Sequence, residues 1–135
     1  MRVEIEAANT VLLEQCRADL LRVCFEKMEK SRNSKIKELR ARMERYEKKR
    51  AQEQADYHKM SMFRRLLSAR TPDHHLAVEQ TVYIKLPMEE IEKLNAEITL
   101  LRGSIRQIDE HADSVVISVR FKDELVQLYW KEGEE

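Results

Sequence analysis

The sequence predicts a mainly α-helical protein, in which a long N-terminal coiled-coil helix precedes a small strand–helix–strand–strand (α+β) unit. Charged residues make up 37% of the 135 residues, whereas glycine and proline occur only twice each. A compact globular domain generally needs more turn-forming residues than that. Apolar residues also recur at alternating spacings of three and four in two stretches, which is the heptad pattern of a coiled coil. A charged helical bundle with short loops is the alternative architecture.

The first predicted element is a helical rod over residues 1–70. No glycine or proline occurs between Val3 and Arg70, and strong helix formers dominate this stretch. Residues 11–28 are so densely apolar that they cover more than one helical stripe, which indicates contact with two neighbours. The residues of this rod that we expect to contact a partner are Leu21, Phe25, Met28, Ile36, Leu39, Met43 and Tyr46.

The course of the seam beyond residue 46 stays open. Continuing the heptad register of Ile36 to Tyr46 puts Arg50 and Glu53 in the seam, and polar seam residues weaken pairing but can fix its register. One apolar stripe then resumes through Tyr57, Met60 and Leu67. A second stripe runs through Ala51, Ala55, Met62 and Leu66.

A connector with a short helix is predicted over residues 71–80, followed by a strand. Thr71 and Pro72 fit an N-cap and a first helical position. Over residues 81–87 the apolar residues Val82, Ile84 and Leu86 alternate with other residues, which is typical of a strand. Pro87 is expected to end that strand and to open the next helix.

The next helix, expected over residues 88–113, carries the clearest heptad seam. Its predicted partner-contacting residues are Ile91, Leu94, Ile98, Leu101, Ile105 and Ile108. Gly103 takes a position that points away from the seam, so it does not interrupt the contact, although it costs about 1 kcal/mol relative to alanine. This helix is the helical element of the α+β unit over residues 81–131.

Two more strands are expected near the C-terminus. Residues 114–121 alternate apolar and polar side chains. Residues 124–130 fit either a strand or a helix, and the shared face of Val126, Leu128 and Trp130 favours a strand. Residues 132–135 form an acidic tail.

The charges are separated along the chain although the net charge is zero. Residues 27–50 hold eleven Lys or Arg against four Glu, which gives +7, and residues 88–135 hold twelve Asp or Glu against six Lys or Arg, which gives −6. The basic surface comprises Lys35, Lys37, Arg40, Arg42, Lys48, Lys49 and Arg50. It is interpreted as the solvated flank of a coiled coil, as a site for an acidic protein surface or, less favoured because glutamates are interleaved, as a nucleic-acid site.

The sequence contains no pattern that predicts catalysis. Two glycines cannot build a phosphate-cradling loop, and no serine lies in a nucleophile elbow. His74 and His75 are adjacent, so on a helix they point about 100° apart and make a poor metal site. Cys16 and Cys24 are too far apart on a helix to form a disulfide. We therefore expect neither an enzyme nor a bound metal or cofactor.

The seams raise the question of what covers them. The helix over 88–113 could fold back along residues 36–67, with Arg40, Arg42 and Lys49 facing Glu90, Glu97 and Asp109. Because that helix is shorter than the rod, part of the rod would still need other coiled-coil subunits or a second copy of the chain.

The expected function is a non-enzymatic coiled-coil scaffold or assembly subunit, with a nucleic-acid-binding adaptor that uses residues 27–50 as the alternative. The seams and the absence of catalytic motifs favour the assembly subunit. Neither a signal peptide nor a membrane span is expected. These features favour an intracellular location, in the cytoplasm or the nucleus, and are compatible with an association with the cytoskeleton.

Overall fold

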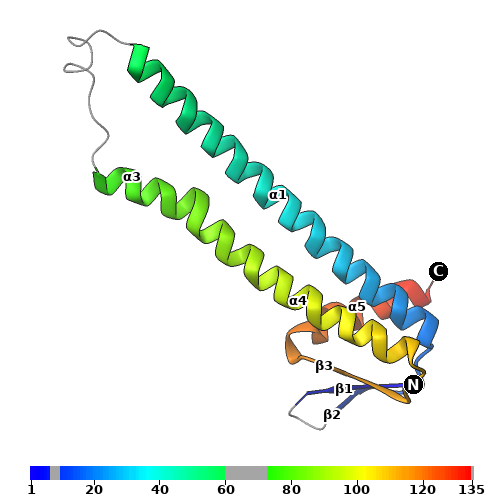
Figure 1. Ribbon diagram of the computed structural model, residues 1–135. Coiled ribbons are helices and arrows are strands. Elements are labelled where there is room, and N and C mark those ends of the chain that lie inside the picture. Colours follow the sequence, from blue (N-terminus) through cyan, green and yellow to red (C-terminus); the bar gives the residue numbers. More distant parts are fainter. Residues whose placement is uncertain (7–9, 60–72, 135) are drawn as a thin grey trace. The chain divides into compact units, whose positions relative to one another are not determined.

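The chain folds mainly into α-helices with a small β-sheet, as the sequence predicts. The computed structural model describes residues 1–6, 10–59 and 73–134, and only the backbone of residues 73–75. Figure 1 shows the elements along the chain. Their order is β1 (Arg2–Ile5), β2 (Thr10–Leu13), α1 (Ala18–Lys59), α3 (Asp73–Gln80), η1 (Thr81–Lys85), α4 (Leu86–Asp109), β3 (Ser114–Ile117), η2 (Val119–Phe121) and α5 (Lys122–Gly133).

The chain divides into two compact units that both contain parts of α1 and α4. Unit 1 consists of residues 1–34 and 94–135, and unit 2 consists of residues 35–93. The expected helix over 71–80 is present as α3, whereas the proposed N-cap at Thr71 and the seam residues Met60, Met62, Leu66 and Leu67 lie outside the described residues.

Unit 1 begins with a strand pair rather than with a helix. The sheet has the order β2–β1–β3, with β1 antiparallel to β2 and parallel to β3. Val3 and Ile5 alternate with Arg2 and Glu4, and this period of two places both apolar side chains on the buried face of the sheet. The prediction that the helical rod begins near Val3 is therefore wrong, and α1 begins at Ala18.

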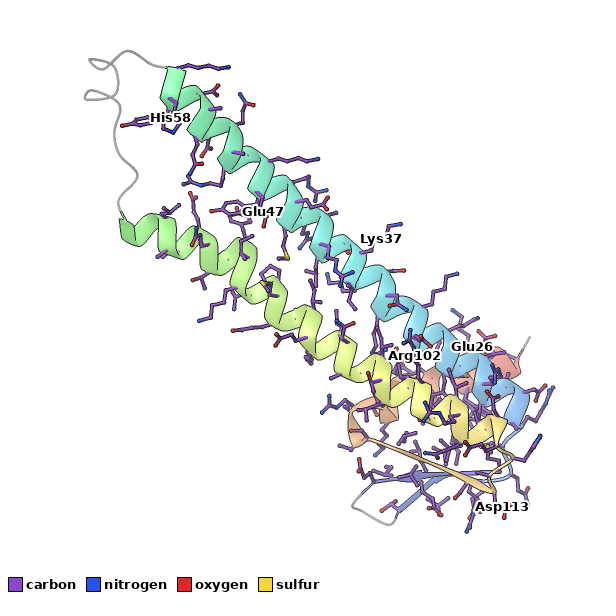
Figure 2. The ribbon with its side chains drawn as sticks, in the orientation of Figure 1. Glu26, Lys37, Glu47, His58, Arg102 and Asp113 are labelled. Carbon is purple, nitrogen blue, oxygen red and sulfur yellow. The ribbon has the colours of Figure 1, made fainter. Side chains whose placement is uncertain are left out.

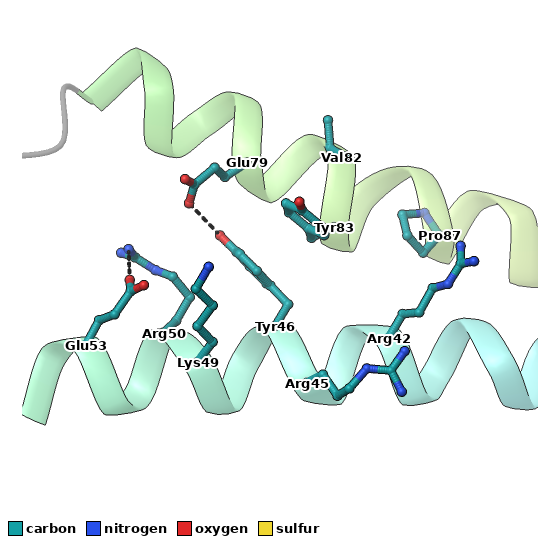
Figure 3. A pocket seen from close by; sticks show the side chains of 10 residues that line it. All are labelled: Arg42, Arg45, Tyr46, Lys49, Arg50, Glu53, Glu79, Val82, Tyr83 and Pro87. Atoms are coloured by element: carbon teal, nitrogen blue, oxygen red, sulfur yellow. Dashed lines mark hydrogen bonds and ion pairs between the residues drawn. The ribbon is translucent and has the colours of Figure 1, made fainter.

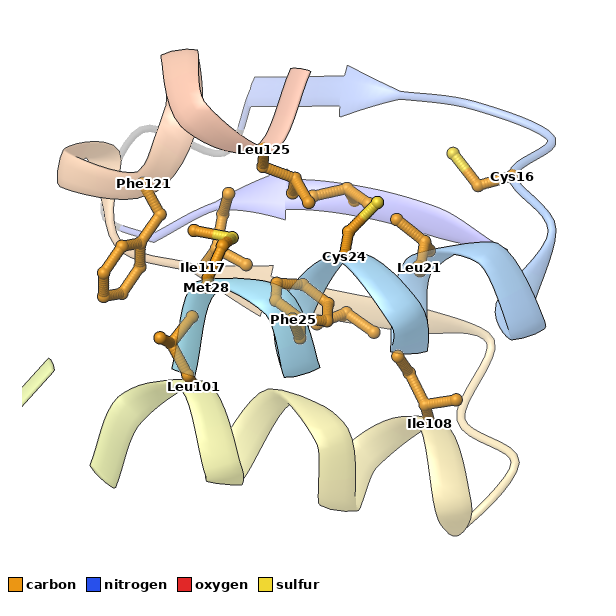
Figure 4. Close-up of a cluster of buried hydrophobic side chains, with 12 residues drawn as sticks. Cys16, Leu21, Cys24, Phe25, Met28, Leu101, Ile108, Ile117, Phe121 and Leu125 are labelled. Carbon is orange, nitrogen blue, oxygen red and sulfur yellow. The ribbon is translucent and has the colours of Figure 1, made fainter. Parts of the chain in front are cut away.

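The core of unit 1 lies between this sheet and three helices. Phe25 and Met28 of α1 and Leu101 of α4 are fully buried there, together with Val115 of β3 and Leu125 of α5. Figure 4 shows these α1 and α4 side chains pointing toward one another between their helices. At about 1.5–3 kcal/mol for each fully buried large apolar side chain, this cluster is the main favourable contribution to the stability of unit 1.

Within unit 1, α4 lies antiparallel to α1. Ion pairs fix the register, since Arg22 pairs with Asp109 and the Arg102 guanidinium donates to Glu29 at 2.7 Å. The sequence suggests a fold-back along residues 36–67, whereas in unit 1 α4 runs along residues 22–32, and two of the predicted ion pairs are wrong. Asp109 pairs with Arg22 and Glu97 pairs with Arg32, instead of with cations of residues 40–49.

Arg32 links three helical elements of unit 1. Its guanidinium donates to both oxygens of Glu124 at 3.0 and 2.8 Å, to Glu97 at 3.4 Å and to the Met28 carbonyl at 3.2 Å. It also lies 5.2 Å from the ring centroid of Phe121. The bond to Glu124 is the main cause of a raised Arg32 pKa, so this cation stays charged. Removing it would leave Glu97 buried without its counter-charge.

The C-terminal segment is helical, so the preference for a strand over 124–130 is wrong. Phe121, Leu125 and Leu128 are spaced by four and three residues and all pack against the core of unit 1. That spacing belongs to a helix face, whereas Trp130, which a strand would place on the buried face, is exposed. The expected strand over 114–121 is confirmed for Ser114–Ile117 and gives way to a 3-10 turn at Val119.

The strand predicted over residues 81–87 is also wrong. Residues 81–85 form a π-helical turn, η1, and residues 86 and 87 begin α4, so the helical course from α3 to α4 is not interrupted. Pro87 provides the reason, because its ring would clash with the Tyr83 carbonyl in a regular α-helix. In the wider turn the N–H of Leu86 donates to the Thr81 carbonyl, five residues back. The heptad helix therefore begins at Leu86, and it ends at Asp109 instead of residue 113.

Candidate functional site

The predicted seam residues of unit 1 lie inside the chain's own core. Leu21, Phe25, Met28, Leu101 and Ile108 belong to its buried cluster, and Ile105 packs against that cluster. Leu94 and Ile98 are buried as well. Most of this heptad seam is therefore covered within unit 1 and is not a free surface.

The predicted seam residues of unit 2 are less uniformly covered. Ile36 and Leu39 are buried, whereas Met43, Tyr46 and Ile91 are half-buried. Toward the C-terminal end of α1 the stripe gives way to exposed polar side chains. Ala51 and Ala55, which belong to the second of the two proposed stripes, are exposed.

A set of large apolar side chains on the surface of unit 2 lies within and next to residues 81–87, where the sequence predicted a strand. Its members are Val78, Val82, Tyr83, Leu86 and Met88. Val78, Val82 and Leu86 are spaced by four and lie on one side of the helix, and we call these three the 78–88 face. Each of these residues is between 49% and 55% exposed. Single exposed apolar residues are common, but a local concentration of this kind is typical of an interaction surface.

The predicted basic residues occupy two sides of α1. Arg42 and Lys49, together with Arg45, recur at spacings of three and four, so they share one side of the helix. Lys37 and Lys48 lie near the opposite side from Tyr46, and Figure 2 shows Lys37 on the outside of α1. Lys35 is paired with Glu38, whereas Arg40 is exposed.

A hollow of about 520 Å³ in unit 2 brings the first of these basic groups together with the 78–88 face. We call it the basic hollow. One wall comes from α1 and the other from residues 79–87, which run beside α1 in the opposite direction (Figure 3). Its lining residues are Arg42, Arg45, Tyr46, Lys49, Arg50, Glu53, Glu79, Val82, Tyr83 and Pro87.

Two tyrosines hold the walls of the basic hollow together. The rings of Tyr46 and Tyr83 stack with their centroids 4.8 Å apart and their planes 14° from parallel. The Tyr46 hydroxyl donates to Glu79 at 3.5 Å. Partial burial, followed by the charge of Glu79, raises the Tyr46 pKa, so the hydroxyl keeps its proton and remains a donor.

The cations of the basic hollow differ in their pairing. Arg42 is paired with Glu38 at 3.0 Å and Arg50 with Glu53 at 3.2 Å. Neither Arg45 nor Lys49 makes an ion pair or hydrogen bond with any residue that the structure describes. Both side chains are exposed. The hollow therefore offers two exposed cations without an ion pair to any described residue, beside an apolar wall.

Other kinds of site find less support in the described residues. Within 1–6, 10–59 and 73–134, no three His, Cys, Asp or Glu side chains are arranged to hold a metal ion. Over the same residues, no helix combines the length and apolar character that crossing a bilayer requires. Cys16 and Cys24 are free thiols buried in unit 1.

The sequence contains a signal for the 78–88 face that the strand prediction obscured. Val78, Val82 and Leu86 recur every fourth residue, which fits one side of a helix as well as Val82, Ile84 and Leu86 fit a strand. The stacking of Tyr46 on Tyr83 joins residues far apart in the chain, and neither local pattern predicts it. Comparison with known proteins adds no further candidate, because no protein-family model, curated protein or solved structure matches this chain.

Proposed function

We propose that this chain is a non-enzymatic assembly subunit, and that the 78–88 face pairs with a helix of a partner protein in a larger complex. The observation that carries this proposal is the concentration of five half-exposed apolar side chains on one short helical stretch. Val78, Val82 and Leu86 follow the spacing with which one helix packs on another.

The energetics of the 78–88 face support a protein partner. Full burial of a large apolar side chain is worth about 1.5–3 kcal/mol, so covering the exposed halves of Val78, Val82 and Leu86 contributes on the order of 3 kcal/mol. A partner helix laid along Val78, Val82 and Leu86 would cover these three side chains, because they lie on one side of the helix.

The proposed mechanism is structural. Unit 1 supplies a packed core with fixed ion pairs, and unit 2 presents its side chains on helices. Helices hold side chains more rigidly than loops do, which lowers the entropy cost of binding a partner. Under this proposal the residues that contact the partner are those of the 78–88 face, and the seam residues that this chain buries stabilise the subunit.

The direct test compares two charge substitutions on the same helix. We expect the full-length tagged chain, isolated from cells that naturally express it, to have a mass by light scattering that includes a stoichiometric partner. Leu86→Asp should reduce that mass to one copy of the chain, because it places a charge in the proposed contact. Leu100→Asp is the matched control, since Leu100 is 45% exposed on α4 but lies outside the 78–88 face.

The control variant should keep the partner, and both variants should keep the helical circular dichroism of the wild type. A wild-type chain that is a single molecule in its native extract would contradict the proposal. A partner retained equally by both variants would also contradict it.

A further inference from the structure

The basic hollow has a positively charged wall and an apolar wall, and this combination favours one kind of ligand. Arg42, Arg45 and Lys49 form a basic side along α1. Val82 and Pro87 line the opposite wall and provide apolar surface. A ligand that satisfies both walls needs negative charges next to apolar groups.

We propose that the basic hollow binds an acidic amphipathic helix of a partner protein, with its carboxylates on Arg45 and Lys49 and its apolar side chains on Val82. This inference rests on the proposed function, because it names the chemistry of the partner that covers the 78–88 face. Charge complementarity selects this occupant, since Arg45 and Lys49 are exposed and make no ion pair with any described residue.

The carboxylates within the hollow favour a protein segment over nucleic acid. Glu53 and Glu79 line the same hollow as the cations, and Glu38 lies next to them through its ion pair with Arg42. These negative charges would repel an unbroken row of phosphates. A helix can place its carboxylates at Arg45 and Lys49 alone and present neutral groups elsewhere.

The shape of the hollow is fixed before a ligand arrives. The Tyr46–Tyr83 stack and the bond from Tyr46 to Glu79 join its two walls. The π-helical turn contains Tyr83, which belongs to the stack, and Val82 next to it. Pro87 follows the turn on the same wall of the hollow. A preformed site loses less conformational entropy on binding than one that must first be ordered.

The test uses the full chain and two double variants that lose the same charge. Arg45→Gln with Lys49→Gln removes the cations of the hollow, whereas Lys37→Gln with Lys48→Gln removes two exposed cations from the opposite side of α1. The probe is a synthetic helical peptide with glutamates on one side and leucines on the adjacent side. Its affinity is measured at low and moderate salt, beside a single-stranded oligonucleotide of equal net charge.

We expect the wild type to bind the acidic peptide with an affinity that falls as salt rises. The hollow variant should bind it roughly tenfold more weakly or worse, while the control variant stays within about twofold of the wild type. Equal losses in both variants, tighter binding of the oligonucleotide or no peptide binding would each overturn the inference. Self-association of the wild type through the hollow would assign it to a second copy and would overturn it too.

A comparison of Leu86→Asp with the Arg45 and Lys49 double variant separates this inference from the proposed function. If Leu86→Asp releases the native partner but the Arg45 and Lys49 variant retains it at moderate salt, the assembly role stands and the acidic-helix inference fails. If Leu86→Asp also leaves the native complex intact, the proposed function itself fails.

Discussion

At the scale of one residue, burial in the core lowers the reactivity of the Cys24 thiol. The side chain is fully buried in unit 1. Burial, and then the nearby charge of Glu132, raises the pKa of Cys24 to about 11 from an ordinary 9.0, and Lys27 opposes this shift only in part. The thiolate is the reactive form, so a thiol with this pKa is poorly nucleophilic near neutral pH.

The first prediction concerns the alkylation of Cys24. In a Cys16→Ala variant at pH 8, iodoacetamide should modify the folded chain at least about 100-fold more slowly than the urea-unfolded chain, because a pKa higher by two lowers the thiolate fraction by that factor. Mass spectrometry of timed samples measures both rates. Equal rates in folded and unfolded chain would show that Cys24 is not in this core.

The same pKa shift predicts how the stability of the folded chain changes with pH. Because the pKa of Cys24 is raised in the folded state, its contribution is fully present below pH 9 and is lost as the pH rises toward about 11. A Cys24→Ala variant should lose stability from the cavity it creates but should lack this alkaline decline. Urea titrations across that pH range separate the two effects.

At the scale of the element, Gly103 in α4 has no structural requirement. Apart from its chain neighbours and the nearby backbone of α4, no heavy atom lies within 4 Å of where its Cβ would be, and its φ is not positive. We expect Gly103→Ala to raise the free energy of unfolding by about 0.5–1 kcal/mol, because alanine loses less backbone entropy in a helix. Chemical denaturation of the variant checks this value.

The matched control for Gly103 is Ala96→Gly, at an exposed position of the same helix. It should lower the free energy of unfolding by a similar amount. A neutral or destabilising Gly103→Ala beside a destabilising Ala96→Gly would show that something contacts Gly103 in solution.

The helices with uninterrupted periodicity could be predicted from the sequence, whereas the short elements could not. The 3.6-residue period and good helix formers identify most of α1 and α4. For β1, four residues carry too little signal against the helix formers that follow, and pairing with β3 decides its conformation. For η1, the alternation of Val82, Ile84 and Leu86 fits a strand, but the widened turn at Pro87 keeps the segment helical.

The basic wall of the candidate site could be predicted from the sequence, whereas the apolar wall could not. Arg42 and Lys49 were expected on a basic surface because residues 27–50 carry a large excess of cations. The apolar wall was missed because it depends on η1 being helical. Arg42 pairs with Glu38 and Arg50 with Glu53, whereas Arg45 and Lys49 make no ion pair with a described residue. This difference depends on side-chain geometry that no local pattern contains.

At the scale of the whole molecule, the chain satisfies much of its own heptad pattern. Residues as far apart as Arg22 and Asp109, or Arg2 and Ser114, are neighbours in unit 1. Such contacts bury Leu101 and Phe25, which the sequence alone would equally assign to a partner. The surface left for an assembly is therefore smaller than the sequence indicates, and under our proposal it is concentrated on the 78–88 face of unit 2.

Covalent footprinting of the chain, alone and within its native complex, tests the central claim most directly. We expect carbene labelling of the 78–88 face to fall several-fold in the complex, because a partner helix covers these side chains, while labelling of Leu100 stays unchanged. Equal labelling of the 78–88 face in both samples would contradict the account.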